Sequence, residues 1–530
     1  MNETNTGLGN DYCRPIASGP ALLELIRSVR APLAVYKDKH GSLSVYPATK
    51  DVTVTNDYSP VATLPPLYPE WLGDRGFCAV HGVRFAYIAG AMARGIASID
   101  MVVAMGKAGM MGFLGSAGLS VEQIQQSICA IQASLNNGEA WGCNLIHTPD
   151  APDLEMSIVQ LFLQLGVARI SASAFMSMTP ALAAYAYKGI YRDSDGVIRR
   201  ANYVFAKISR PETAAAFMKP APQAMLKQLL ERGLLTEAEV QLAQNLPVSE
   251  DITVEADSGG HTDGQILTAL FPTILDLKHQ LSEQYQYQRD IRIGAAGGLG
   301  TPSAIAAAFA LGAAYVLTGS VNQACIEAGT SQAVKQLLTQ VRTGDVAMAP
   351  CADMFEAGVK VQVLKRRTLY APRSTKLYEI YKRYDSLEDI PAAELEQLEK
   401  AIFRQSLTSV WQTTKRFFET RDPAQLAKAE ANPKVKMGLI FRWYLGSSSR
   451  WPIDGDEDRL VDYQIWCGPA QAAFNDWVRG SFLEPAENRA VVQVARNLLE
   501  GAAIVTRAQQ LRTFGIAVPQ SAFAVVPQKL

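Results

Sequence analysis

The sequence predicts an α/β fold whose central domain is a (β/α)8 barrel. Between positions 83 and 354, short apolar runs alternate with segments of helical periodicity, and there are eight such runs. Seven helical segments lie between the runs, and one more follows near 331–341. Eight strand-then-helix units at this spacing are typical of a closed parallel barrel.

The expected strands follow one another regularly, with one interruption. Residues 211–249, between the fifth and sixth strands, predict an insertion of two or three helices. An open doubly wound sheet is the alternative, but the turn after the first strand, AGAMARG at 89–95, lacks the G-x-G-x-x-G pattern usual there. The expected strands lie at 83–89, 109–114, 141–146, 168–172, 203–208, 252–256, 291–296 and 314–318.

Composition indicates a folded chain with no general affinity for polyanions. Of the 530 residues, 48% are apolar and 19% are charged, which excludes an intrinsically disordered chain. The formal net charge is −1, so we expect neither nucleic acid nor a membrane as a partner. Residues 293–325 carry no charge and suggest a spanning helix, but their seven glycine and proline residues favour a buried strand–turn–helix–strand segment.

Two flanking regions complete the expected organisation. Residues 1–75 predict a small N-terminal module and linker, with a hairpin formed by 33–36 and 43–46. The barrel is expected over 76–360. A helical C-terminal region is expected over 361–530, where apolar residues recur with helical spacing.

The cysteines and residues 1–20 indicate in which cellular compartment the protein is expected. Seven cysteines are scattered without a C-x-x-C pair, so we expect no disulfide framework and no metal site. Residues 1–20 show no charged segment followed by an apolar run, which argues against a signal peptide. A cytoplasmic location is the expectation.

Two neighbouring strands of the expected barrel end in glycine turns that suit a phosphate group. The seventh strand is followed by GGLG at 297–300, and the eighth is followed by Gly319 and Ser320. Each turn precedes a helix start, where backbone N–H groups and the helix dipole favour an anion. The phosphate site of many barrels uses these two loops. The pattern favours a phosphate site over glycines that only form tight turns.

Polar residues at other strand ends are candidates for chemistry. The sixth strand is followed by GGH at 259–261, where the histidine either faces a ligand or lies in a surface loop. Asn144 offers a donor and an acceptor to a heterocycle, and Lys207 can stabilise an anionic ring or a phosphate. Cys143 and Cys351 have no histidine near in sequence, so we expect both to pack in the core.

These segments resemble one known superfamily. EADSGGH at 255–261 is similar to the E-A-G-G-H element of the 2-nitropropane dioxygenase (nitronate monooxygenase) superfamily of FMN barrels, but carries two extra residues, Asp257 and Ser258. That superfamily also contains FMN-dependent enoyl-acyl-carrier-protein reductases. Three segments resemble its phosphate region: AAGG at 295–298, LGA at 311–313 and TGS at 318–320. Two others, AGAM at 89–92 and AGMMG at 108–112, resemble its first two strands.

A closer resemblance, to the PfaD family, extends over nearly the whole chain. It rests on SASAFM at 171–176, FAKIS at 205–209, ADSGGHTD at 256–263, ADMFE at 352–356 and the long helical tail. Members are trans-acting enoyl reductases of polyunsaturated-fatty-acid and trans-acyltransferase polyketide synthases. The resemblance implies an FMN barrel that takes hydride from NADPH. It also implies reduction of the α,β double bond of a thioester held on an acyl carrier protein.

The resemblance and the strand ends together assign expected roles. His261 is expected to be catalytic, either as the proton donor or as a hydrogen-bond donor to the thioester oxygen. Other residues are expected to bind FMN: Gly90, Ala91, Met92, Asn144, Lys207, Gly259, Gly260, Gly297, Gly298, Gly319 and Ser320. A nitronate monooxygenase acting on a small molecule and a non-catalytic synthase scaffold are the alternative functions.

A local basic cluster follows the expected barrel and contains only one acidic residue, Glu379. Because acyl carrier proteins are typically acidic, this cluster is a candidate docking patch, and a solvated surface is the alternative. A homo-oligomer is a further expectation for the chain. The basic cluster consists of Lys360, Lys365, Arg366, Arg367, Arg373, Lys376, Lys382 and Arg383.

Overall fold

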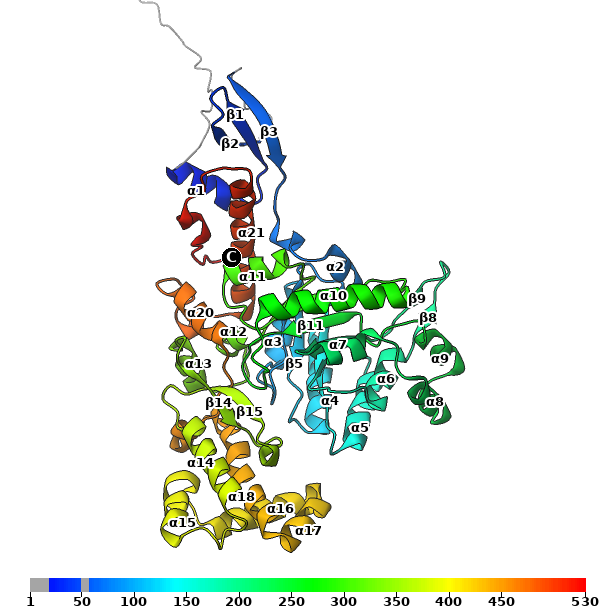
Figure 1. Cartoon of the computed structure of the whole chain (residues 1–530), viewed down its shortest axis with the longest axis vertical. Coiled ribbons are helices and arrows are strands. Elements are labelled where there is room, and N and C mark those ends of the chain that lie inside the picture. The colour runs from blue at the N-terminus through cyan, green and yellow to red at the C-terminus, as the bar shows by residue number, and fades with distance from the viewer. Residues whose placement is uncertain (1–18, 49–56) are drawn as a thin grey trace, which may run out of the picture.

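A closed barrel of eight parallel strands forms the centre of the molecule (Figure 1). The computed structural model describes residues 19–48 and 57–530. The strand order is β4-β5-β6-β7-β10-β11-β12-β13, and β13 pairs with β4 to close the ring, which confirms the expected (β/α)8 fold class. The strands are β4 (Tyr87–Ala89), β5 (Met111–Leu114), β6 (Trp141–Ile146), β7 (Arg169–Ser173), β10 (Tyr203–Ile208), β11 (Asp251–Glu255), β12 (Arg292–Ala296) and β13 (Val316–Thr318).

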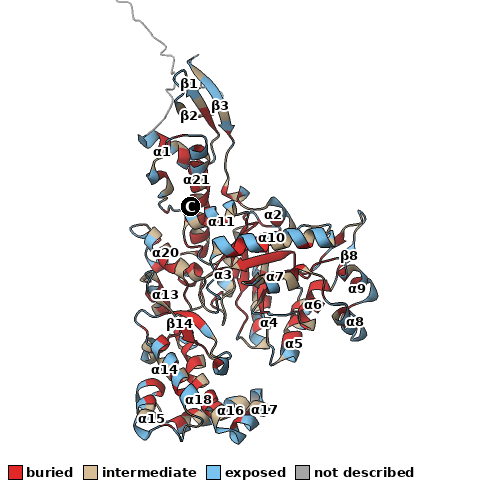
Figure 2. Cartoon of the chain, viewed as in Figure 1, coloured by how far each residue is buried: buried red, intermediate tan, exposed pale blue. Residues whose placement is uncertain are grey.

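Helices cover these strands on the outside. The barrel strands are largely buried, whereas the outer face of α10 is exposed (Figure 2). The uncharged stretch at 293–325 forms β12, α11, β13 and the short α12, which confirms its expected place in the barrel. The covering helices that follow the strands in order are α3 (Ile99–Lys107), α4 (Val121–Ser134), α5 (Pro152–Gln164), α6 (Pro180–Tyr187), α7 (Pro211–Met218), α10 (Leu267–Tyr285) and α11 (Pro302–Ala310).

No helix among residues 19–48 and 57–530 is both long and apolar enough to cross a membrane.

The eighth covering helix comes from far along the chain. Helix α21 (Val491–Thr513) packs against α11 and α3, and its inner side chains belong to the barrel core. Gly501 permits the close approach, because a Cβ there would lie 2.6 Å from Cγ of Pro302. The chain thus returns to the barrel after position 360, and the boundaries expected at 75 and 360 stay a prediction.

Between β13 and α21 the chain forms a hairpin and a group of helices with its own core. The hairpin pairs β14 (Val346–Pro350) with β15 (Lys360–Leu364) in antiparallel register. The following helices, α14 to α19, form what we call the helical subdomain, packed around side chains such as Leu377, Phe441 and Tyr444. The bounds of the segments between β13 and α21 are α12 (Ser320–Gln323), α13 (Gln332–Thr339), α14 (Tyr370–Arg383), α15 (Ala392–Leu398), α16 (Leu407–Arg421), α17 (Pro423–Ala431), α18 (Pro433–Ser448), α19 (Trp451–Asp454) and α20 (Pro469–Val478).

The N-terminal module contains a three-stranded antiparallel sheet. The expected hairpin is confirmed as β1 (Leu33–Asp38) and β2 (Leu43–Pro47), and a third strand that the sequence did not predict, β3 (Tyr58–Leu64), pairs with β1. Helix α1 (Gly19–Arg27) packs with this sheet against the end of α21. Residues 1–18 and 49–56, which fall within the expected module, lie outside the described residues.

The insertion expected at 211–249 contains three helices. Helix α7 covers the barrel, whereas α8 (Gln223–Glu231) and α9 (Glu237–Ala243) extend outward beside α6. A small hairpin of β8 (Tyr191–Arg192) and β9 (Ile198–Arg199) lies beside α9. The β8–β9 hairpin precedes the amino end of β10, and α8 and α9 precede the amino end of β11.

A buried charge network closes the amino end of the barrel beneath α2 (Arg75–His81). Asp251, the first residue of β11, accepts two hydrogen bonds of 2.7 Å from Arg292 and contacts His81 Nε2 at 3.1 Å. Arg169 Nε donates to His81 Nδ1 at 3.3 Å, which places the imidazole proton on Nε2. Burial lowers the pKa of His81, so this ring is neutral at pH 7. The network belongs to the stabilising end of the barrel.

Candidate active site

Lys207 and Glu255 form an ion pair at the carboxyl ends of two neighbouring strands, β10 and β11. Lys207 Nζ lies 3.1 Å from Glu255 Oε1, and Ser258 Oγ donates to the same oxygen at 3.1 Å. The Lys207 side chain stays 26% exposed. Glu255 thus fixes the ammonium group of Lys207 at the barrel mouth, where the sequence predicted a lysine. The pairing with Glu255 was not predicted.

Asn144 lies on β6, close to the same end of the barrel. Its residue is only 7% exposed, and its Oδ1 accepts a hydrogen bond of 3.0 Å from Ser173 Oγ on β7. Within residues 19–48 and 57–530, its Nδ2 has no hydrogen-bond partner. A buried amide with an unused donor fits a ligand that supplies an acceptor.

Gly259 and Gly260, before His261, are fixed by chain segments that lie beyond the barrel. Gly260 exchanges two backbone hydrogen bonds with Gln362 on β15, at 3.0 and 2.7 Å. A Cβ at Gly259 would lie 2.9 Å from the backbone nitrogen of Cys467, and Gly260 has a φ of +81°. Both glycines are therefore required by packing and backbone shape. Their expected contact with a cofactor stays a prediction.

His261 lies against a cysteine that the sequence did not connect with it. His261 Nε2 is 3.6 Å from Sγ of Cys351, which follows β14. Sγ of Cys351 also donates to the carbonyl oxygen of Asp353 at 3.1 Å. Cys351 is 2% exposed, as expected of a packing cysteine, but it also restrains the imidazole.

The protonation states of this pair follow from their surroundings. Part of His261 is exposed, yet the surrounding protein restricts hydration of the imidazole and lowers its pKa; Asp353 opposes the shift and Lys207 adds to it. Burial, reinforced by Asp353, raises the pKa of Cys351 to about 12. At neutral pH the site therefore holds a neutral imidazole beside a protonated thiol.

The two glycine turns expected to bind phosphate differ in what surrounds them. Gly297 and Gly298 both have positive φ, and a Cβ at Gly297 would lie 2.6 Å from the backbone of Ala256. A Cβ at Gly298 or Gly319 would meet no heavy atom within 4 Å. Gly297 thus permits a close approach within the barrel, whereas Gly298 and Gly319 border open space that can hold a ligand.

The start of α20 completes the walls of this region. Gly468 N donates to Ser320 Oγ at 3.1 Å, and a Cβ at Gly300 would lie 2.1 Å from the carbonyl oxygen of Ala470. The sequence did not predict this contact, because positions 320 and 468 are far apart and no local pattern links them.

Gly90, Ala91 and Met92 form the loop after β4, between the ends of β13 and β5. Gly90 N donates to the carbonyl oxygen of Thr318 at 2.8 Å. A Cβ at Gly115, after β5, would lie 1.7 Å from the carbonyl oxygen of Met92. The loop is therefore held on both sides, and the structure brings it to the same barrel end as the glycine turns.

The residues at the barrel mouth fit a flavin mononucleotide. Gly298 and Gly319 leave room for a phosphate, Lys207 supplies a positive charge, and Asn144 supplies an unused donor. Such groups match the phosphate and the polar ring edge of a flavin. Within the described residues, no group of His, Cys, Asp and Glu side chains is arranged to hold a metal ion.

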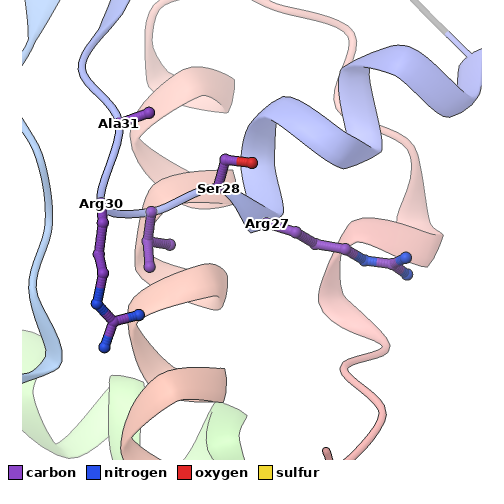
Figure 3. A pocket seen from close by; sticks show the side chains of 5 residues that line it. Arg27, Ser28, Arg30 and Ala31 are labelled. Atoms are coloured by element: carbon purple, nitrogen blue, oxygen red, sulfur yellow. The ribbon is translucent and has the colours of Figure 1, made fainter.

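A surface hollow lies away from the barrel mouth. A hollow of about 420 Å³ is lined by residues 27–31, beside α1 and α21 (Figure 3), and Arg30 there pairs with Glu500. It lies in the N-terminal module, away from the strand ends, so we assign it no role in the site.

The basic cluster at 360–383 is divided by the fold. Lys365 and Arg367 are exposed in the turn after β15, and Arg366 lies 3.3 Å from Asp345. Arg373 pairs with Asp462, a fully buried carboxylate. Arg373 therefore supports the helical subdomain, and docking by the remaining residues stays a prediction.

Two family models match consecutive parts of the chain. The model described as nitronate monooxygenase matches residues 217–383, which include the last three barrel strands, the β14–β15 hairpin and α14. The model described as [acyl-carrier-protein] S-malonyltransferase, inserted helical domain, matches residues 384–463 in the helical subdomain.

Curated relatives are much longer than this chain. A polyunsaturated fatty acid synthase subunit of Thraustochytrium sp. is 43% identical over 508 residues, which cover 94% of this chain and 34% of that relative. Polyketide biosynthesis protein PksE of Bacillus subtilis is 46% identical over 436 residues, which cover 82% of this chain and 56% of that protein.

One solved structure matches this chain over almost the whole length of the solved protein. The enoyl reductase domain of MlnA, from the macrolactin biosynthesis cluster of Bacillus amyloliquefaciens, has a TM-score of 0.80 and 39% identity to this chain. The match covers 84% of this chain and 99% of that domain.

Proposed function

Because this chain belongs to the PfaD family of nitronate monooxygenase-like barrels, we propose that it is an FMN-dependent enoyl reductase. In the proposed reaction NADPH supplies a hydride to the β-carbon of an enoyl thioester, and a proton adds at the α-carbon. The products are the saturated thioester and NADP⁺. The 39% identity to an enoyl reductase domain, over 99% of its length, carries the proposal.

The proposed cofactor contacts use the groups gathered at the strand ends. When bound, FMN supplies hydride transfer between the nucleotide and the substrate. Its phosphate is assigned to the two glycine turns, and its ring to the loop after β4 together with Asn144 and Lys207. The open space at Gly298 and Gly319 supports this orientation, since a side chain at either position would occupy it.

His261 is proposed to act on the thioester. A neutral imidazole donates an N–H to oxygen as negative charge develops there, or delivers that proton to the α-carbon and takes a replacement proton from solvent. The Cys351 contact at 3.6 Å restrains the ring, and the hairpin bridge at Gly260 fixes the loop that carries it. This chain therefore contributes orientation and charge stabilisation.

The proposed partner is an acyl carrier protein or a carrier domain of a synthase. The two curated relatives are named as a fatty acid synthase subunit and a polyketide biosynthesis protein, which supports a carrier-bound substrate. The exposed basic residues after β15 are the proposed docking surface. NADPH rather than NADH, a cytoplasmic location and a homo-oligomeric state are kept as expectations from the sequence.

Turnover assays with product analysis test the function. Under anaerobic conditions, protein loaded with FMN should turn over NADPH repeatedly when an enoyl thioester is supplied on a carrier protein, and mass spectrometry should show that the acyl chain gains two hydrogens. Nitronate is the comparison substrate. Turnover of nitronate without reduction of the enoyl thioester would favour the nitronate monooxygenase alternative instead.

A further inference from the structure

Arg94 is held in a strained backbone conformation at the barrel mouth. It follows the loop of Gly90 to Met92 and has a φ of +58°, a left-handed value that side chains other than glycine rarely adopt. Its N–H donates to the carbonyl oxygen of Ala117 at 2.8 Å. The neighbouring Gly95 N–H donates to Gly115 O, also at 2.8 Å. The loop after β5 thus fixes the position from which the Arg94 side chain extends.

The side chain itself is partly buried, and the part of the chain that the structure describes gives it no anionic partner. Its Cγ lies 3.2 Å from where a Cβ on Gly118 would be, so the chain runs over the loop after β5. Among residues 19–48 and 57–530, its guanidinium forms no hydrogen bond and no ion pair. Other buried or partly buried arginines have partners: Arg200 and Arg373 pair with a carboxylate. The fully buried Arg489 and Arg507 donate to backbone carbonyl oxygens.

The electrostatic surroundings place this guanidinium near the reacting groups. Burial lowers the pKa of Arg94, Asp353 and Asp454 oppose the shift, and Arg450 of the helical subdomain adds to it. Asp353 also acts on His261. One carboxylate therefore lies within electrostatic range of both Arg94 and His261, at the junction of barrel and helical subdomain.

A desolvated cation without a partner is costly unless a ligand supplies the missing anion. Guanidinium has a planar fork of donors that matches the oxygens of a phosphate group. Backbone strain of the kind seen at Arg94 persists where the surrounding structure holds a functional side chain in place. The side chain lies toward β5, whereas the glycine turns assigned to the FMN phosphate follow β12 and β13.

We propose that Arg94 binds a phosphate group of a reactant, which is either the 2′-phosphate of NADPH or the phosphodiester of the carrier protein's pantetheine arm. The proposal rests on the proposed function, since both ligands are its reactants. It supplies the arginine for phosphate recognition that no sequence motif indicated.

The test compares the parent with Arg94→Met and Arg94→Lys, each loaded with FMN. Met removes the charge, and Lys keeps the charge without the planar fork of donors. Met and Lys meet the same backbone strain as Arg at this position, so differences between the variants report on the side chain. Arg232→Met, at the exposed end of α8, removes an equal charge far from the site.

Two measurements distinguish the two phosphates. Titration calorimetry gives the affinity for NADP⁺ and for NAD⁺, which differ in the 2′-phosphate alone. Stopped-flow reoxidation of photoreduced flavin compares an enoyl phosphopantetheine thioester with an enoyl pantetheine thioester that lacks the phosphate. Arg94→Met should lower either the affinity for NADP⁺ or the rate of reoxidation by the phosphopantetheine thioester by about 10- to 100-fold, as expected for a lost charge-assisted hydrogen bond. The matching ligand without the phosphate, NAD⁺ or the pantetheine thioester, should be unaffected.

A loss confined to NADP⁺ identifies the nucleotide phosphate, and a loss confined to the phosphopantetheine thioester identifies the arm. Equal losses with and without phosphate, no loss in either pair, or a fall in FMN content each overturn the proposal. If the parent neither binds NADP⁺ nor is reoxidised by the thioesters, both the proposed function and the Arg94 proposal fail. A parent that does both, with an Arg94→Met variant that matches it, refutes the Arg94 proposal alone.

Discussion

The side chains that meet at the barrel mouth come from positions far apart in the sequence. Lys207 and Glu255 are separated by 48 residues, and His261 and Cys351 by 90. The placement of Lys207 was predictable, because apolar runs locate the strands and active sites lie at their carboxyl ends. The contact of Cys351 with His261 was not, since it depends on a hairpin outside the barrel, and the cysteine was expected only to pack in the core.

Replacing the histidine tests its role directly. We expect His261→Ala to slow reoxidation of reduced flavin by an enoyl thioester about 10²- to 10⁴-fold, as is typical when a positioned donor or acid is lost. FMN content should not change, because the phosphate turns follow other strands. Single-turnover absorbance measures the rate, with His279→Ala on the exposed side of α10 as the control. An unchanged rate would remove His261 from the mechanism.

A carboxylate introduced into the phosphate region should expel the cofactor. Gly298→Asp puts a negative charge into the open space beside the turn, where it would repel a phosphate. We expect the purified variant to lose most of its FMN, measured by absorbance per mole of protein. Gly233→Asp is a matched control, since Gly233 also has a positive φ and open surroundings but lies between α8 and α9. Equal FMN content in both variants would show that the phosphate binds elsewhere.

At the scale of elements, the eight strands were predictable and the last covering helix was not. Strands of a parallel barrel are buried on both faces, so each appears as a short apolar run between turns. The layer of helices is completed by α21, which lies beyond the whole helical subdomain. Helical periodicity predicts that 490–514 forms a helix, but it carries no information about which surface that helix covers.

The charge network at the amino end should matter for stability. Asp251→Asn leaves the guanidinium of Arg292 buried with only the more distant Glu250, at 3.9 Å, as a charge partner, so we expect a loss of about 3 kcal/mol. Thermal denaturation followed by circular dichroism should show a midpoint lower by several degrees. Glu231→Gln, which removes an exposed partner of Lys227, should leave the midpoint almost unchanged. A midpoint equal to that of the parent would mean that the buried network contributes nothing net.

At the scale of the whole molecule, the chain links its parts at the barrel mouth. The hairpin β14–β15 bridges the His261 loop, α20 abuts the glycine turns, and α21 returns to the barrel wall. The exposed basic residues after β15 follow the end of this hairpin at which Leu364 pairs with Val346. Cys351 follows the opposite end, at which Pro350 pairs with Lys360.

Docking by charge predicts a selective effect of salt. Raising ionic strength should lower kcat/KM for a carrier-bound enoyl substrate, because exposed charges are screened beyond about 10 Å at 0.1 M. A short enoyl thioester without a carrier should be almost unaffected. Lys365→Glu with Arg367→Glu should reproduce that difference, and Lys227→Glu with Arg232→Glu, on the distant α8, should not. Equal effects on both substrates would place the docking surface elsewhere.

The central claim is hydride transfer from NADPH to an enoyl thioester through one flavin, and stopped-flow absorbance of the FMN-loaded protein tests it most directly. Mixing with NADPH should bleach the flavin, and a second mixing with an enoyl-carrier thioester under anaerobic conditions should restore its colour, whereas a nitronate should not. Flavin that stays bleached with the enoyl thioester, or that recovers only with the nitronate, would contradict the account.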